Sequence, residues 1–278
     1  EPQAEEYERY GDPLLEALLA MHAERFDEAR TGLEALLESA TSPRYLWLEV
    51  GRARLLSEHV PEGKAALEAF LGSLDEGEAS EARVAVNLTL ARLADDDGQF
   101  EEAMRRFEAA VDAVPDDYRP YLAMGAFLRD KGHADEALEV LRTASELAKN
   151  AATDWRLLEE LGLASEQAGK PKEAESFLEQ VIEFFTSRQV MDFPPTTATA
   201  LATLYEKDGR IDRAADMYRA LSKGSDGANH AKYHYEAGRL LREINLDDEA
   251  HRMLTRAQAL LSEDDTELRA QIDTLLQP

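Results

Sequence analysis

Residues 98–137, GQFEEAMRRFEAAVDAVPDDYRPYLAMGAFLRDKGHADEA, decide the fold of this chain. A glycine, an apolar residue, a glutamate and an alanine recur after 34 residues: Gly98, Phe100, Glu102 and Ala103, then Gly132, Ala134, Glu136 and Ala137. Two amphipathic helical patterns lie within this period, so the stretch holds one complete two-helix repeat unit.

A period of 34 residues with two helices per repeat resembles the tetratricopeptide repeat (TPR) family. Phe107 and Ala110 in the second helix, and Pro115 after it, match the family pattern. The resemblance implies an all-α fold, a right-handed α-solenoid of stacked antiparallel helix pairs (a TPR superhelix). For function it implies only a class, a scaffold that binds partner proteins.

The repeat continues along the chain. Each expected second helix begins with an acidic turn and a small anchor residue, at Ala29, Ala65, Ala103, Ala137, Ala174, Ala214 and Ala250. These seven alanines predict seven helix pairs over residues 12–262. Twelve residues before most anchors stands an alanine or glycine, which lets the paired helices approach closely. In the second repeat either Gly51 or Ala53 can fill this position, and its turn lacks the glycine or asparagine found in most others.

The two ends of the chain differ from the repeats. Residues 1–11 are polar without apolar periodicity, so we expect an N-terminal tail in which Tyr7 and Tyr10 touch the first helix. Residues 263–278 carry apolar side chains at helical spacing, Leu268, Ile272, Leu275 and Leu276. They predict a C-terminal capping helix that covers the last apolar face of the solenoid.

A long loop follows the second helix of the fifth repeat and ends at two prolines, Pro194 and Pro195. Met191 and Phe193 in this loop have two interpretations. They either form an exposed partner contact or fold back as a local cap, and the second is the commoner arrangement.

Composition restricts the partners. The net charge is −26, from 57 acidic against 31 basic residues, which argues against nucleic acid and anionic membranes. No apolar run is long enough for direct membrane insertion of this form of the chain. The chain starts at Glu1, so we expect a processed or trimmed form. Localisation stays open between the cytoplasm and a bacterial periplasm or envelope.

Nothing in the sequence resembles a catalytic site, and we expect no enzyme, cofactor or metal. Without cysteine there are no disulfides or thiolate ligands. His230 and His234 lie four residues apart, but no glutamate follows the first as in a zinc-binding HExxH motif. In addition, the repeat register places His234 toward the core. We therefore expect a packed pair.

The expected partner-binding residues lie on the first helices. In TPR superhelices these helices line the inner groove, and the residues eighteen and eleven before each anchor point into it. The regular repeats place no acid there and five bases. Including the irregular second repeat and one further turn in two others, the candidates are Arg52, Arg92, Arg119, Arg129, Arg156, Lys232, Arg239 and Arg242, with Arg54 the alternative to Arg52.

Two interpretations of these cations stay open. They make the groove suitable for an acidic or carboxylate-bearing peptide, or they pair internally with neighbours such as Asp130 and Glu159, each surface pair contributing ~0–1 kcal/mol. The groove does not match the carboxylate clamp of TPR co-chaperones, because Leu88 and Ala123 stand where the clamp has lysine and asparagine.

The functional hypothesis is a non-catalytic scaffold or adaptor that binds a segment of a partner protein, possibly an acidic one, in the concave groove. One alternative is an envelope-associated bacterial assembly factor for a pilus, secretion or polysaccharide export. Another is a self-assembling structural scaffold. Because a charged tail and a capping helix oppose end-to-end stacking, we expect a monomer.

Overall fold

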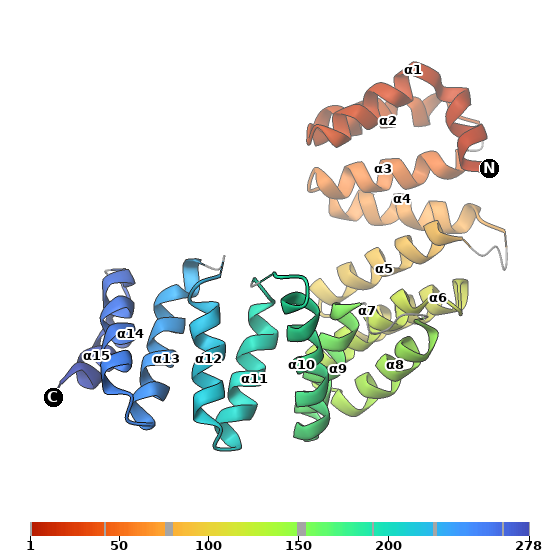
Figure 1. Cartoon of the computed structure of the whole chain (residues 1–278). Helices are drawn as coiled ribbons and strands as arrows, with labels where there is room; N and C mark the ends of the chain where they lie inside the picture. Colours follow the sequence, from red (N-terminus) through yellow and green to blue (C-terminus); the bar gives the residue numbers. More distant parts are fainter. Residues whose placement is uncertain are drawn as a thin grey trace. The chain divides into compact units, whose positions relative to one another are not determined.

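The structure is a computed structural model that describes residues 2–41, 43–75, 80–148, 154–190, 192–224, 227–262 and 264–277. Within these residues it contains fifteen α-helices, one short 3₁₀-helix and no strand (Figure 1). In chain order they are α1 Pro2–His22, α2 Phe26–Ser39, α3 Arg44–Leu56, α4 Val60–Ser73, α5 Glu81–Asp96, α6 Phe100–Ala113, α7 Tyr118–Asp130, α8 Ala134–Leu147, α9 Trp155–Gln167, α10 Pro171–Thr186, α11 Pro195–Lys207, α12 Ile211–Leu221, η2 Gly227–Asn229, α13 His230–Glu243, α14 Asp247–Leu260 and α15 Thr266–Leu276. None of the described helices is both long and apolar enough to cross a membrane.

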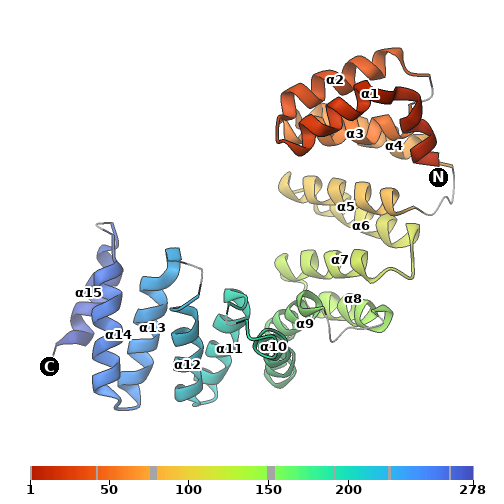
Figure 2. The same cartoon turned by 45° about the horizontal axis from the view of Figure 1, so that its top comes forward.

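The helices α1 to α14 form seven pairs, and α15 follows the last pair. The chain divides into two compact units, Glu1–Ala123 and Met124–Pro278, with the boundary inside α7. In the first unit each helix from α1 to α6 packs on the next, and the first helices α1 and α3 also touch (Figure 2). Leu14, Leu33, Leu46 and Val50 form part of its core.

The second unit has the same construction. Helices α8 to α15 pack in sequence, and two pairs of neighbouring first helices, α9 with α11 and α13 with α15, are in contact. The expected helix after the seventh pair is α15, in which Ile272 is fully buried against Leu254 and Ala257 of α14. This part of the prediction agrees with the structure.

The small residues in the first helices allow close packing of each pair. A Cβ atom added to Gly125 would lie 2.5 Å from Cγ of Leu141, and one added to Gly162 would lie 2.6 Å from Leu178. Both distances are far below van der Waals contact. A larger side chain would therefore force the two helices of the pair apart.

The second repeat corrects one of the predicted anchors. A Cβ on Gly51 would lie 2.6 Å from Cδ2 of Leu67, which gives Leu67 the role that Leu141 has in the fourth repeat. Gly63, four residues before Leu67, is buried at the anchor position, whereas the predicted anchor Ala65 is exposed. The corrected register places Arg52 eleven residues before the anchor and so selects it over Arg54.

The turn inside each pair requires a residue in the left-handed conformation. Five turns use a glycine or asparagine as predicted: Gly98, Gly132, Gly169, Gly209 and Asn245. The first two repeats place Glu24 (φ 58°) and Glu58 (φ 66°) there instead. Because a side chain with a Cβ is strained in this region, these two turns are less favourable than the others.

The prediction of a polar tail over residues 1–11 is wrong for residues 2–10, which are helical. Gly11, with φ 55° and ψ −140°, breaks α1 into two helical halves that point in different directions. The Tyr7 hydroxyl donates to Glu49 Oε1 of α3 at 2.6 Å, and Tyr7 and Tyr10 pack against the core of the first unit. Burial and the Glu49 carboxylate raise the pKa of Tyr7.

The same segment caps α3. Pro43, at the N-cap position of α3, provides no side-chain hydrogen bond to the helix. The carboxylate of Glu6, only 5% exposed, accepts hydrogen bonds from the backbone N–H groups of Tyr45 and Leu46, each at 3.0 Å. Glu6 thus replaces the missing cap. Sequence periodicity did not predict this segment because polar contacts hold much of it in place.

The loop before α11 decides between the two interpretations of Phe193. Phe193 is 5% exposed and packs in the core with Ala198 and Leu201, so it folds back as a local cap and is not a partner contact. Met191 lies outside the described residues.

Candidate partner-binding surface

The two histidines contact separate neighbouring groups. His230 Nε2 lies 2.9 Å from the carbonyl oxygen of Gly224, and His234 Nδ1 lies 3.3 Å from Sδ of Met253. Burial lowers the pKa of His234, so the ring is kept neutral. Within the described part of the chain there is no group of three side chains that could hold a metal ion.

Five of the eight candidate cations make internal contacts. Arg129 of α7 is 16% exposed and binds Glu160 of α9, with Nε to Oε2 at 2.6 Å. It also pairs with Asp130 at 2.8 Å. Burial alone would lower the pKa of Arg129, but the hydrogen bond to Glu160 raises it above its ordinary value. Arg129 therefore joins two successive first helices.

The next first helices are joined in the same way. Arg239 of α13 pairs with Glu206 of α11 at 3.0 Å and with Glu236 at 2.9 Å. Arg242 donates to the backbone carbonyl oxygens of Leu275 and Gln277, the latter at 3.1 Å, at the C-terminus of α15. These two arginines hold α11, α13 and α15 together.

Hydrogen bonds from neutral hydroxyl groups join the remaining pair of first helices, α9 and α11. The Glu159 carboxylate of α9 accepts hydrogen bonds from the hydroxyls of Thr196 and Thr197 in α11, both at 2.7 Å. Polar links therefore join α7 to α9, α9 to α11, α11 to α13 and α13 to α15. Arg129, Arg239 and Arg242 thus make internal contacts of the kind that the second interpretation expects.

Two candidates in the first unit also pair with carboxylates, but their own side chains are exposed to solvent. The Arg119 guanidinium, 58% exposed, binds Asp117 at 2.7 Å and Glu81 at 3.4 Å. Its hydrogen bonds lower the pKa of Asp117. Arg52 lies 3.3 Å from Glu49, the carboxylate that also accepts the Tyr7 hydroxyl.

Three candidates have neither a carboxylate nor a carbonyl partner for the side chain among the described residues: Arg92 of α5, Arg156 of α9 and Lys232 of α13. All three are exposed. The Arg156 guanidinium lies over the Trp155 ring, 4.8 Å from its centre. Among the predicted residues, these three have charges that are available to a ligand.

The first turns of the helices divide by charge. All seven second helices have an acid in the first turn, as expected from the helix dipole. Two of the seven first helices, α1 and α5, also have an acid there, Glu5 and Glu81. The other five, α3, α7, α9, α11 and α13, have none, and four of them carry a cation there: Arg44, Arg119, Arg156 and Lys232. Cations at this end oppose the dipole, typically by 0.3–1 kcal/mol. Helix stability therefore does not explain their placement.

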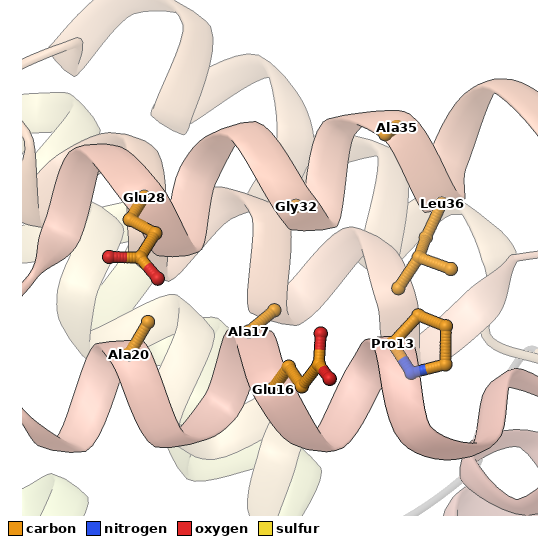
Figure 3. Close-up of a pocket in the computed structure, with 8 residues that line it drawn as sticks. All are labelled: Pro13, Glu16, Ala17, Ala20, Glu28, Gly32, Ala35 and Leu36. Atoms are coloured by element: carbon orange, nitrogen blue, oxygen red, sulfur yellow. The ribbon is translucent and has the colours of Figure 1, made fainter.

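A crevice of about 320 Å³ lies between α1 and α2 (Figure 3). Small residues of both helices line it, and Glu16 and Glu28 add one carboxylate from each helix. None of the eight candidate cations lines this crevice. It is a separate feature of the first helix pair.

Antiparallel helix pairs stacked through small residues and left-handed turns define an α-solenoid of the TPR class. Residues 96–161 match the tetratricopeptide repeat family model. Residues 96–161 are therefore similar to tetratricopeptide repeats, and the predicted all-α solenoid fold is confirmed for the chain. No match is found among curated protein sequences.

Solved structures of several TPR proteins are similar. The C-terminal part of a TPR protein from Cytophaga hutchinsonii superposes with a TM-score of 0.72 at 18% identity, covering 95% of this chain and 100% of that one. PilW, a type IV pilus biogenesis factor, gives 0.60 at 16% identity, with coverage of 86% and 100%. YrrB, a TPR protein with an unusual peptide-binding site, gives 0.54 at 18% identity, with coverage of 72% and 94%. At these identities the likeness concerns the fold alone.

Proposed function

We propose that this chain is a non-catalytic scaffold whose first helices bind an acidic segment of a partner protein. The TPR fold is a protein-interaction fold, and the similar structure of YrrB has a peptide-binding site. The observation that carries the proposal is that three exposed cations at first-helix positions have no carboxylate partner among the described residues, in a chain of net charge −26. Arg156 and Lys232 also lie at helix N-termini, whose dipoles attract carboxylates.

The eight candidate cations then have two roles. Arg92, Arg156 and Lys232 attract and bind the ligand, with the arginines able to hold a carboxylate through two parallel hydrogen bonds. Arg129, Arg239 and Arg242 fix the spacing of the first helices. Arg52 and Arg119 are exposed, and each already pairs with a carboxylate of its own, Arg52 with Glu49 and Arg119 with Asp117.

Charge reversal tests the proposal. The purified chain is used to retain proteins from an extract of its source cells, and the retained proteins are quantified for wild type, R92E, R156E and K232E. Arg252 of α14 is exposed and has no carboxylate partner in the described residues, so R252E is a matched control. We expect each test variant to retain about tenfold less of a specific partner, while R252E retains it fully.

Equal retention by all variants would overturn the proposal. A second comparison separates the two roles of the cations. R239Q removes the link between α11 and α13, so it should lower the melting temperature with a smaller effect on partner retention, whereas K232Q should do the reverse.

No observation in the chain favours the envelope-assembly alternative beyond the fold that it shares with PilW. Self-assembly has one point of support, the open crevice between α1 and α2, which the helical segment 2–10 does not line. Against it, α15 covers the last pair. We expect sedimentation velocity to give the mass of one chain at all concentrations; a mass that rises with concentration would favour self-assembly.

A further inference from the structure

Aromatic and arginine side chains form a cluster at one edge of the second unit, where α9 begins and α10 ends. Its members are Trp155, Arg156, Phe184, Phe185 and Arg188. The ring centres of Trp155 and Phe185 are 5.4 Å apart, and those of Phe184 and Phe185 are 5.3 Å apart, both edge to face. Arg156 lies 4.8 Å from the centre of the Trp155 ring, and Arg188 lies 3.7 Å from that of Phe184.

Core packing accounts for only part of this aromatic–arginine cluster. Phe185 packs against the core of the second unit. All three rings are nevertheless only half-buried, and Val190, just beyond Arg188, is 40% exposed. Apolar surface of this kind stands out in a chain with 32% charged residues.

The two guanidinium groups are not neutralised. Neither Arg156 nor Arg188 has a carboxylate partner among the described residues, and both are exposed. Arg188 donates to the carbonyl oxygen of Phe184 at 2.7 Å, which leaves its other N–H groups available. Arg156 lies in the first turn of α9, where the helix dipole disfavours a cation.

Three of the nearby acids are engaged elsewhere, whereas Glu183, next to Phe184, is exposed. Asp154 accepts a hydrogen bond from the backbone N–H of Arg156 as the N-cap of α9. Glu159 binds the threonines of α11, and Glu160 binds Arg129. The cluster therefore keeps two positive charges beside an apolar surface within a strongly acidic protein.

We infer that the aromatic–arginine cluster binds a partner segment in which carboxylates flank a bulky apolar side chain. The inference rests on the proposed function and adds an apolar anchor to the acidic ligand. Charge complementarity identifies the occupant: two unpaired guanidinium groups fit carboxylates, and the rings between them fit an aliphatic or aromatic side chain.

Stacking prepares the arginines for this role. A guanidinium held over a ring loses side-chain freedom before the ligand arrives, so less entropy is lost on binding. Stacking uses the face of the guanidinium, so N–H groups that make no other hydrogen bond stay available to a carboxylate. Buried aromatic and arginine residues are also the side chains that most often dominate binding energy at protein interfaces.

The test uses two synthetic peptides of glutamate and serine, one with a central leucine and one with alanine in its place. Binding is followed by the indole N–H signals of the full chain in NMR. Trp155 reports the cluster, and Trp47, packed in the first unit, is the internal reference. We expect the leucine peptide to shift the Trp155 signal, leave the Trp47 signal unchanged, and bind about tenfold more tightly than the alanine peptide.

Substitutions then show which side chains of the cluster are responsible for peptide binding. R188Q should weaken both peptides, and F184A should remove the preference for leucine. K172E, on the exposed surface at the other end of α10, should change neither. Circular dichroism checks that each variant is folded.

Three outcomes would overturn the inference. If both peptides bind equally, without a shift of Trp155 and yet with dependence on Lys232, the cluster is structural while the proposed function stands. If neither peptide binds at millimolar concentration, both proposals fail. If the Trp155 signal shifts with protein concentration alone, the occupant of the cluster is a second copy of the chain.

Discussion

The terminal helices at the two ends of the chain are held in place by different kinds of contact. At the C-terminus, α15 lies on the last helix pair, buries Ile272 completely and is held by Arg242 through its terminal carbonyl groups. At the N-terminus, the helical segment 2–10 turns away at Gly11 and uses Glu6 to cap α3. The crevice between α1 and α2 stays open.

The difference follows from the side chains of the two segments. A helix can cover an apolar face only if it supplies apolar residues at helical spacing, as Leu268, Ile272 and Leu275 do. Segment 2–10 supplies carboxylates and two tyrosines, so its contacts combine hydrogen bonds to a helix end and to Glu49 with the packing of Tyr7 and Tyr10 against the core. The C-terminal end should therefore depend on apolar burial and the N-terminal end on polar pairing.

The largest effect is expected at the C-terminal end. I272A removes a fully buried side chain, which typically costs about 2–5 kcal/mol. Native-state hydrogen exchange should show faster exchange in α13, α14 and α15 and no change in α1 to α4. Unchanged protection of α14 would mean that α15 does not stabilise the last pair.

A smaller effect is expected at the N-terminal end. E6A leaves the backbone N–H groups of Tyr45 and Leu46 without their acceptor, a loss of roughly 1–3 kcal/mol. Exchange should accelerate at the start of α3 and in residues 2–10. Glu8 is exposed, so E8A is the control; equal effects of E6A and E8A would show that the cap contributes nothing.

Substitutions in the turns should raise the stability of the fold instead of lowering it. E58G relieves a left-handed residue that bears a side chain, and we expect the first unit to gain roughly 0.5–1 kcal/mol. N245G in the seventh repeat should gain less, because asparagine tolerates this conformation. Urea denaturation followed by hydrogen exchange measures both, and a loss of stability in E58G would contradict the expected strain.

The smallest effect concerns pH. Burial and Glu49 raise the pKa of Tyr7 in the folded chain, so its contribution is complete below the unfolded pKa near 10 and is lost as pH rises toward the folded value. At pH 10 half of the unfolded tyrosine is ionised, and the loss is at most about 0.4 kcal/mol.

Limited proteolysis of residues 2–10 between pH 8 and pH 10 measures this loss. Cleavage in wild type should increase with pH. Y7F lacks the ionisable hydroxyl, so if it shows the same pH dependence, Tyr7 is not the group responsible.

The amino-acid sequence by itself determined the repeat, the helix pairs and the capping helix. Local steric requirements fix these features: small residues such as Gly125 and Gly162 at close helix contacts, glycine in left-handed turns, and apolar residues at helical spacing. Where these signals were ambiguous, as between Gly51 and Ala53, only the contact of Gly51 with Leu67 decided the register.

Only the tertiary structure decided which cations are available. Arg119 and Arg156 occupy the same first-helix position, eighteen residues before their anchors, yet Arg119 binds Asp117 and Glu81 whereas Arg156 stacks on its neighbour Trp155. The cap that Glu6 places on α3 is likewise formed by residues 39 and 40 positions apart. Such pairings depend on the distance between helices and on side-chain orientation, and the pattern of a single sequence specifies neither.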